Sequence, residues 1–204
     1  PNSPAVILVH QRGSTKEAWG DLGSKLVAEG YAAIAIDLRG HGATRNPEGN
    51  VINLKSLGDI DYQYMLRDIE AAHDYLDEQA DVDGNRVAII GASIGANLGI
   101  MYASYDKRVR TVVALSPGLD YYSLKPAEYL EDYGKRALYL IAAKGDTYSH
   151  DSSEALAAAA TESDPVSYRP FDGKDHGTNL LTAHPGLDMT IISGWLLNHL
   201  PPDR

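Results

Sequence analysis

The chain has 204 residues, enough for one domain whose core needs no disulfide bonds. Cysteine is absent, which excludes disulfides, thiolate metal sites and a cysteine nucleophile. The formal net charge of −10 argues against binding to nucleic acid phosphates or anionic membranes, because both partners require clustered lysine and arginine.

In the first half of the chain, short apolar runs alternate with amphipathic segments. Residues 5–10 (AVILVH) predict a strand, which is followed by a polar loop and a helix that ends near Gly30. Residues 31–38 (YAAIAIDL) predict a second strand. Asp59 is placed to cap a long helix. Four apolar residues share one face of that helix: Met65, Ile69, Ala72 and Leu76.

The second half of the chain continues this alternation. Residues 87–90 form an apolar run that predicts a buried strand, and a helix follows it. Three further strands are predicted at residues 109–115, 137–143 and 166–171. Two more helices are predicted at residues 153–160 and 187–200. Strands that alternate with helices predict βαβ units, and hence an α/β fold in which helices cover both faces of a mainly parallel sheet of about six strands.

We therefore expect residues 1–204 to form a single domain. Residues 117–136, between the fourth and fifth strands, are too few for a separate cap domain. In sheets of this kind, ligands bind at the carboxyl ends of the strands, so the loops that follow the strands are where catalytic residues are expected.

The third predicted strand ends in the sequence Gly91-Ala92-Ser93-Ile94-Gly95, which is a GxSxG motif. In a nucleophile elbow the strand and the following helix nearly touch, so the residues two before and two after the serine must be small. The bend lifts the hydroxyl clear of the sheet and aims the helix N-terminus at it. The alternative is a glycine-rich structural turn with an uninvolved serine. The apolar strand before the motif and the helical pattern after it favour the elbow.

A serine nucleophile needs an imidazole base and a carboxylate that orients the imidazole. Asp146 follows the fifth predicted strand and His176 follows the sixth. The order Ser93, Asp146, His176 along the chain is the order expected of an α/β-hydrolase triad. Among the seven histidines, His184 is the next candidate for the base, and Asp120 is the alternative acid.

The oxyanion hole requires two N–H donors. One is expected from Ile94, directly after the nucleophile, and the other from the backbone of Gln11 or Arg12 in the loop after the first strand. The sequence does not decide between these two residues. Three tyrosines are candidates for lining the substrate pocket: Tyr121, Tyr122 and Tyr148.

Together these segments resemble the α/β-hydrolase superfamily, in particular its small, lidless dienelactone-hydrolase-like carboxylesterases. The resemblance covers nearly the whole chain. It is carried by ILVHQRGSTKEAW (7–19), GYAAIAIDLRGHGAT (30–44), VAIIGASIGAN (87–97), AAKGD (142–146) and DGKDHG (172–177). The resemblance implies hydrolysis of carboxylic esters through an acyl-enzyme, with Ser93, His176 and Asp146 as the triad and with no metal or organic cofactor.

Three features depart from the family pattern. The usual His-Gly before the oxyanion loop is His10-Gln11 here, which affects the second oxyanion donor. Dienelactone hydrolases proper use a cysteine nucleophile, which this chain lacks, so their substrate is disfavoured. The chain also begins at what resembles the third strand of the usual fold, so we expect the first two strands to be missing, either because the fold is a minimal form or because they were trimmed.

The sequence thus predicts a serine carboxylesterase for short-chain or aromatic small-molecule esters, because a site without a lid encloses little apolar surface. A thioesterase, acyltransferase or amidase would use the same triad, and a binding module that keeps the fold without catalysis is the alternative from another class. No nucleic acid partner is expected, and no membrane span, since a span requires roughly 20 apolar residues. No signal peptide is recognised, but the start at Pro1 fits both a cytoplasmic protein and one exported after removal of an N-terminal segment. The oligomeric state is not assigned.

Overall fold

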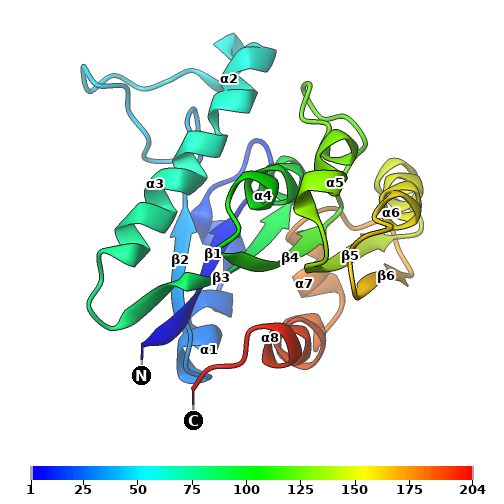
Figure 1. Ribbon diagram of the computed structural model, residues 1–204. Coiled ribbons are helices and arrows are strands. Elements are labelled where there is room, and N and C mark those ends of the chain that lie inside the picture. Colours follow the sequence, from blue (N-terminus) through cyan, green and yellow to red (C-terminus); the bar gives the residue numbers. More distant parts are fainter. Residues whose placement is uncertain (1, 204) are drawn as a thin grey trace.

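A computed structural model describes residues 2–203 of the chain. Its centre is one six-stranded sheet in the order β2-β1-β3-β4-β5-β6, in which all neighbouring strands are parallel (Figure 1). The chain runs from β1 to β2 on one side and then returns to β3 on the other side of β1, so the direction of winding changes between β1 and β3. The predicted α/β fold with a mainly parallel sheet of about six strands is confirmed. The strands are β1 (Ser3–Val9), β2 (Ala32–Ile36), β3 (Val82–Ala92), β4 (Val109–Leu115), β5 (Ala137–Ala143) and β6 (Val166–Phe171).

Helices cover both faces of this sheet (Figure 1). One face is covered by α1 (Leu22–Ala28), α7 (Asn179–Ala183) and α8 (Ser193–His199). The other face is covered by α2 (Asp59–Tyr64), α3 (Leu66–Asp77), α4 (Ile94–Tyr105), α5 (Leu130–Tyr133) and α6 (Thr147–Ala159). Short 3-10 turns are η1 (Lys16–Trp19), η2 (Leu54–Ser56) and η3 (Pro126–Tyr129), and η4 (Leu187–Ile192) is a π-helical segment. Among residues 2–203, no helix has the length and apolar character needed to cross a membrane.

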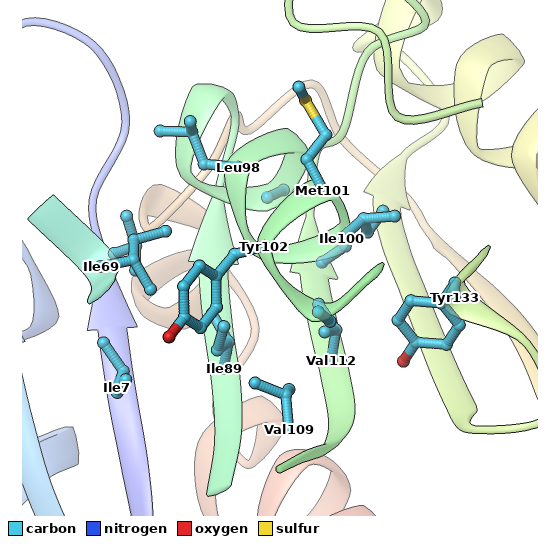
Figure 2. Close-up of a cluster of buried hydrophobic side chains, with 14 of the residues drawn as sticks. Ile7, Ile69, Ile89, Leu98, Ile100, Met101, Tyr102, Val109, Val112 and Tyr133 are labelled. Carbon is cyan, nitrogen blue, oxygen red and sulfur yellow. The ribbon is translucent and has the colours of Figure 1, made fainter. Parts of the chain in front are cut away.

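The sequence of β3 explains why the core has two layers. The side chains of residues 87–90 are all buried, because successive residues of a strand point to opposite faces and helices cover both. Ile89 packs in the layer under α3 and α4, which Figure 2 shows. Ile90 packs in the layer under α1 and α8, which also receives Trp19 and Trp195.

The strands β4, β5 and β6 have the predicted bounds, but three helices differ from the prediction. The helix predicted from residue 59 onward is divided at Met65, where a buried side chain coincides with a tight turn between α2 and α3. Helix α6 begins at Thr147 and not at residue 153, directly after Asp146. The last predicted helix is π-helical as far as Ile192 and α-helical only after it.

Candidate active site

Ser93 lies where β3 ends and α4 begins, at the carboxyl edge of the sheet. Its φ of 54° is in the left-handed region, which is strained for a residue with a side chain. A Cβ added to Gly91 would overlap the Gly95 carbonyl oxygen, and one added to Gly95 would overlap the Val9 carbonyl oxygen. The small residues on both sides of Ser93 are therefore required by close backbone contacts between strand, helix and loop.

His176 and Asp146 lie in the loops that follow the neighbouring strands β6 and β5. His176 Nδ1 is 2.6 Å from Asp146 Oδ2. The Asp146 side chain is 16% exposed and the His176 side chain 37%, so the carboxylate is held inside while the ring reaches solvent. A carboxylate on Nδ1 leaves Nε2 as the ring nitrogen that can accept a proton.

The loop that carries His176 packs against the turn at Ser93. A Cβ added to Gly177 would lie 3.5 Å from the Ala92 Cβ, so the residue after the histidine neighbours the residue before the serine. The Gly177 amide donates to Ser116 Oγ at 2.9 Å, and the Ser93 amide donates to the carbonyl oxygen of the last β4 residue at 2.8 Å. Both loops are thus fixed to the end of β4. Within residues 2–203, Ser93 Oγ and His176 Nε2 form no hydrogen bond with each other.

Two further hydroxyl groups adjoin the histidine. Ser149 is completely buried in α6, and its Oγ lies 3.5 Å from His176 Nδ1 and 2.9 Å from the Tyr121 hydroxyl. Burial raises the pKa of Tyr121, although the nearby hydroxyls of Ser149 and Ser93 favour its ionised form. Sequence reasoning missed Ser149 because it started the helix at residue 153. The signal that could have found it is Asp146 itself, because an aspartate directly before a helical segment is a common helix-start residue in sequences and would have put Ser149 in the first turn.

The loop after β1 lies beside the first turn of α4. A Cβ added to Gly95 would come within 2.8 Å of the His10 carbonyl oxygen. The backbone amides of Ile94, Gln11 and Arg12 have no acceptor within the described part of the chain. All three amides can therefore donate to a ligand, and the geometry does not choose between Gln11 and Arg12.

The side chain of Gln11 connects this loop to the loop of the histidine. Gln11 Nε2 donates to Thr178 Oγ1 at 2.9 Å, and the Thr178 amide donates to Gln11 Oε1 at 3.3 Å. A Cβ added to Gly177, whose φ is +60°, would lie 3.1 Å from Gln11 Cδ. The glutamine that replaces the usual glycine after His10 thus makes two contacts with the residues that follow His176.

The predicted pocket tyrosines lie in two groups. The Tyr121 ring contacts the His176 ring edge to face, with the centroids 6.3 Å apart, and the Tyr148 ring packs on Tyr121 at 5.4 Å. The Tyr122 ring instead stacks on Tyr62, with the centroids 4.3 Å apart. The structure therefore brings Tyr121 and Tyr148 to the histidine, while Tyr122 lies with Tyr62.

The segment that carries Tyr121 is held by Asn97, a fully buried residue of α4. Asn97 Nδ2 donates to the carbonyl oxygens of Gly118 and Leu124, each at 2.8 Å, and Asn97 Oδ1 accepts from the Gly118 amide at 3.0 Å. The helix that begins at the candidate nucleophile thus also fixes the loop beside it.

The alternative base and acid lie in other surroundings. The His184 ring packs on Phe171, with the centroids 4.5 Å apart. The Asp120 carboxylate accepts the Ser123 amide at 2.9 Å. Neither side chain is hydrogen-bonded to His176 within residues 2–203. In the same residues, no group of three or more His, Cys, Asp or Glu side chains is arranged to hold a metal ion.

Comparisons with known proteins give the chain its family. Residues 6–200 match a family model described as the alpha/beta hydrolase family. Quorum-quenching protein AidA of Acinetobacter baumannii is 29% identical over 122 residues, and the putative hydrolase YtaP of Bacillus subtilis is 30% identical over 112 residues. These alignments cover 59% and 54% of this chain but only 38% of each relative. The chain therefore matches well under half the length of these two proteins.

Solved structures with the same fold include an esterase and a dienelactone hydrolase. The Pyrococcus furiosus esterase Pf2001 superposes with a TM-score of 0.78 at 20% identity, covering 98% of this chain and 84% of that chain. Dienelactone hydrolase from Anabaena variabilis superposes with a TM-score of 0.74 at 18% identity, covering 98% and 88%. The resemblance predicted from the sequence is confirmed at the level of the fold. Since the family model matches nearly the entire chain, the protein belongs to the alpha/beta hydrolase family.

Proposed function

We propose that the protein is a serine carboxylesterase that hydrolyses small esters through an acyl-enzyme. The observation that carries the proposal is the 2.6 Å contact between His176 Nδ1 and Asp146 Oδ2, at the same edge of the sheet as a serine with left-handed backbone geometry. Membership in the alpha/beta hydrolase family and the likeness of the fold to an esterase support it.

In the proposed mechanism, Ser93 Oγ attacks the ester carbonyl carbon while its proton passes to His176 Nε2. The carbonyl oxygen becomes an oxyanion and accepts hydrogen bonds from the Ile94 amide and from the amide of Gln11 or Arg12. The bond to the alcohol oxygen then breaks, and the alcohol leaves with the proton from His176. Water attacks the acyl-serine in the same way, which releases the carboxylic acid and restores the serine hydroxyl.

The first proton transfer requires a hydrogen bond between Ser93 and His176. Such contacts are often long before substrate binds and shorten in the Michaelis complex. We propose that the Ser93 hydroxyl turns toward His176 Nε2 when an ester occupies the site.

The test combines covalent labelling with kinetics. A fluorophosphonate probe should label the peptide that contains Ser93, and the protein should hydrolyse 4-nitrophenyl acetate. Ser93→Ala should abolish labelling and lower kcat/KM by at least about a thousandfold, as loss of a triad member does. Ser104→Ala is the matched control, because Ser104 is a buried serine of the same helix whose hydroxyl donates only to the Met101 carbonyl oxygen.

The control should keep both labelling and activity. The proposal would be wrong if Ser93→Ala kept more than about a tenth of the activity, or if the probe labelled a different residue.

A further inference from the structure

Arg12 is an exposed cation held in one orientation by two tyrosines. Its Nε donates to the Tyr62 hydroxyl at 2.6 Å, and its guanidinium carbon lies over the Tyr122 ring, 5.0 Å from the centroid. The two rings are stacked with 13° between their planes, and Tyr62 is buried. A guanidinium fixed in this way loses little conformational entropy when it binds a ligand.

The outer edge of this guanidinium has no partner in the protein. Within residues 2–203, Arg12 forms no ion pair, and its only hydrogen bond is the one from Nε to Tyr62. Among the arginines of residues 2–203, Arg39, Arg86 and Arg108 are paired with aspartates, whereas Arg12 belongs to the larger group that forms no ion pair. The chain has 28 acidic residues against 18 lysines and arginines. Because only Nε is hydrogen-bonded within residues 2–203, the two Nη groups of Arg12 are available to an external anion.

The position of Arg12 relates it to the proposed catalytic site. Arg12 follows His10 by two residues, and the His10 carbonyl oxygen lies against the first turn of α4, directly after Ser93. Tyr122 follows Tyr121, whose ring contacts the catalytic imidazole proposed above. Tyr122 has a φ of 56°, and its ring lies under the guanidinium. The cation and the aromatic ring thus belong to the two segments that flank the proposed site, the loop after β1 and the segment of Tyr121.

We propose that Arg12 binds a carboxylate of the substrate, so that the enzyme prefers esters that also carry an anionic group next to a flat apolar portion. The two Nη groups match the two oxygens of a carboxylate. Tyr122, which is 42% exposed, offers apolar contact area beside the guanidinium. This inference rests on the proposed esterase function, because it assigns the substrate class of the same site.

The kinetic test compares two acetate esters of similar shape, 4-acetoxybenzoate and 4-acetylphenyl acetate, of which only the first is anionic. The readout is the ratio of their kcat/KM values, so that any general loss of activity cancels. We expect Arg12→Met to lower the ratio of anionic to neutral ester about tenfold, as the loss of a charge-assisted bidentate contact would. Tyr62→Phe should lower it less, because it removes only the hydrogen bond that orients the guanidinium.

Arg67→Met is the matched control. Arg67 also lies over a tyrosine ring, 5.0 Å from the centroid of Tyr64, but it belongs to α3 and not to the loop after β1. The ratio of kcat/KM for the anionic ester to that for the neutral ester should be the same in Arg67→Met as in the unmodified protein. A ratio that stays within about twofold in Arg12→Met, or that falls equally in Arg67→Met, would overturn the inference.

A binding experiment separates this inference from the proposed function, because it needs no turnover. Isothermal titration calorimetry should detect 4-hydroxybenzoate binding that is at least about tenfold tighter than that of the neutral 4-hydroxybenzamide, and Arg12→Met should remove the difference. Equal binding of the two ligands by the unmodified protein would refute the carboxylate site. If the protein hydrolyses neutral esters but binds 4-hydroxybenzoate and 4-hydroxybenzamide equally, only this inference is refuted. If it binds 4-hydroxybenzoate more tightly but hydrolyses no ester, only the esterase proposal is refuted.

Discussion

Replacing Asn97 with alanine should lower the free energy of unfolding more than the same replacement of an exposed asparagine does. The Asn97 side-chain amide forms hydrogen bonds with three buried backbone groups. These are the Gly118 amide and the carbonyl oxygens of Gly118 and Leu124. Alanine favours the helix slightly but leaves all three groups without a partner, in a place that is completely buried.

The magnitude follows from the cost of burying an unsatisfied polar group, about 1–3 kcal/mol each. Water that enters the vacated space recovers part of this cost, so we take a value near the lower end for each group. The sum is about 3–5 kcal/mol, a large part of the roughly 5–15 kcal/mol by which native domains are stable. For a chain of this size, such a loss corresponds to a decrease in Tm of roughly 10 °C.

The assay is urea unfolding followed by far-UV circular dichroism, with Asn198→Ala as the control. Asn198 is an exposed residue of α8, and its replacement should change the free energy of unfolding by less than about 0.5 kcal/mol. A decrease of less than about 1 kcal/mol in Asn97→Ala would refute the reasoning, since it would mean that the three hydrogen bonds contribute almost nothing beyond what water supplies.

Two further perturbations test the turn at the serine and the loop after β2. Gly95→Ala should prevent folding or lower Tm by more than about 10 °C, because the added Cβ would overlap the Val9 carbonyl oxygen. Thermal unfolding measures this, and a Tm within a few degrees of the unmodified protein would contradict the close contact. Burial opposes ionisation of Asp37, but the amides of Ala43 and Lys16 and the Lys16 ammonium outweigh it and lower the pKa to about 2. A carboxyl whose pKa is lower in the folded state stabilises the protein above its unfolded pKa and loses that contribution as pH falls through the folded one. The free energy of unfolding of the unmodified protein should therefore exceed that of Asp37→Asn by at most about 2 kcal/mol at pH 6, and solvent screening at the exposed lysine reduces this value. The difference should shrink as pH falls from about 4 to about 2. A difference as large at pH 2 as at pH 6 would show that it does not arise from the charge.

The sequence was sufficient for those features that depend on strand order. The strands β4 and β5 are mainly apolar runs between polar residues, so their bounds could be read directly from the sequence. Because β5 and β6 are neighbours, residues just after them meet, and the contact between Asp146 and His176 follows from that arrangement. The close approach of Gly91 and Gly95 was likewise predictable, because the motif requires it.

Features that depend on side-chain packing between loops could not be predicted. The break at Met65 is a tertiary effect, since the apolar spacing continues through it without interruption. The contacts of Gln11 with Thr178 and of Arg12 with Tyr62 join residues far apart in the chain, and no local pattern encodes them. Propensity and periodicity describe a segment by itself, whereas these contacts arise only when two loops are brought to the same edge of the sheet.

Both tryptophans lie in the layer between the sheet and helices α1 and α8, and this position determines what intrinsic fluorescence can report. Trp19 is buried in that layer and Trp195 stacks on Tyr139 beside it, at 4.5 Å between centroids. The chain has no other tryptophan. Tryptophan fluorescence therefore reports unfolding of the layer on the α1 and α8 side of the sheet and does not respond to local changes around α4 on the other side. A mismatch between emission and ellipticity curves would reveal which half of the molecule gives way first.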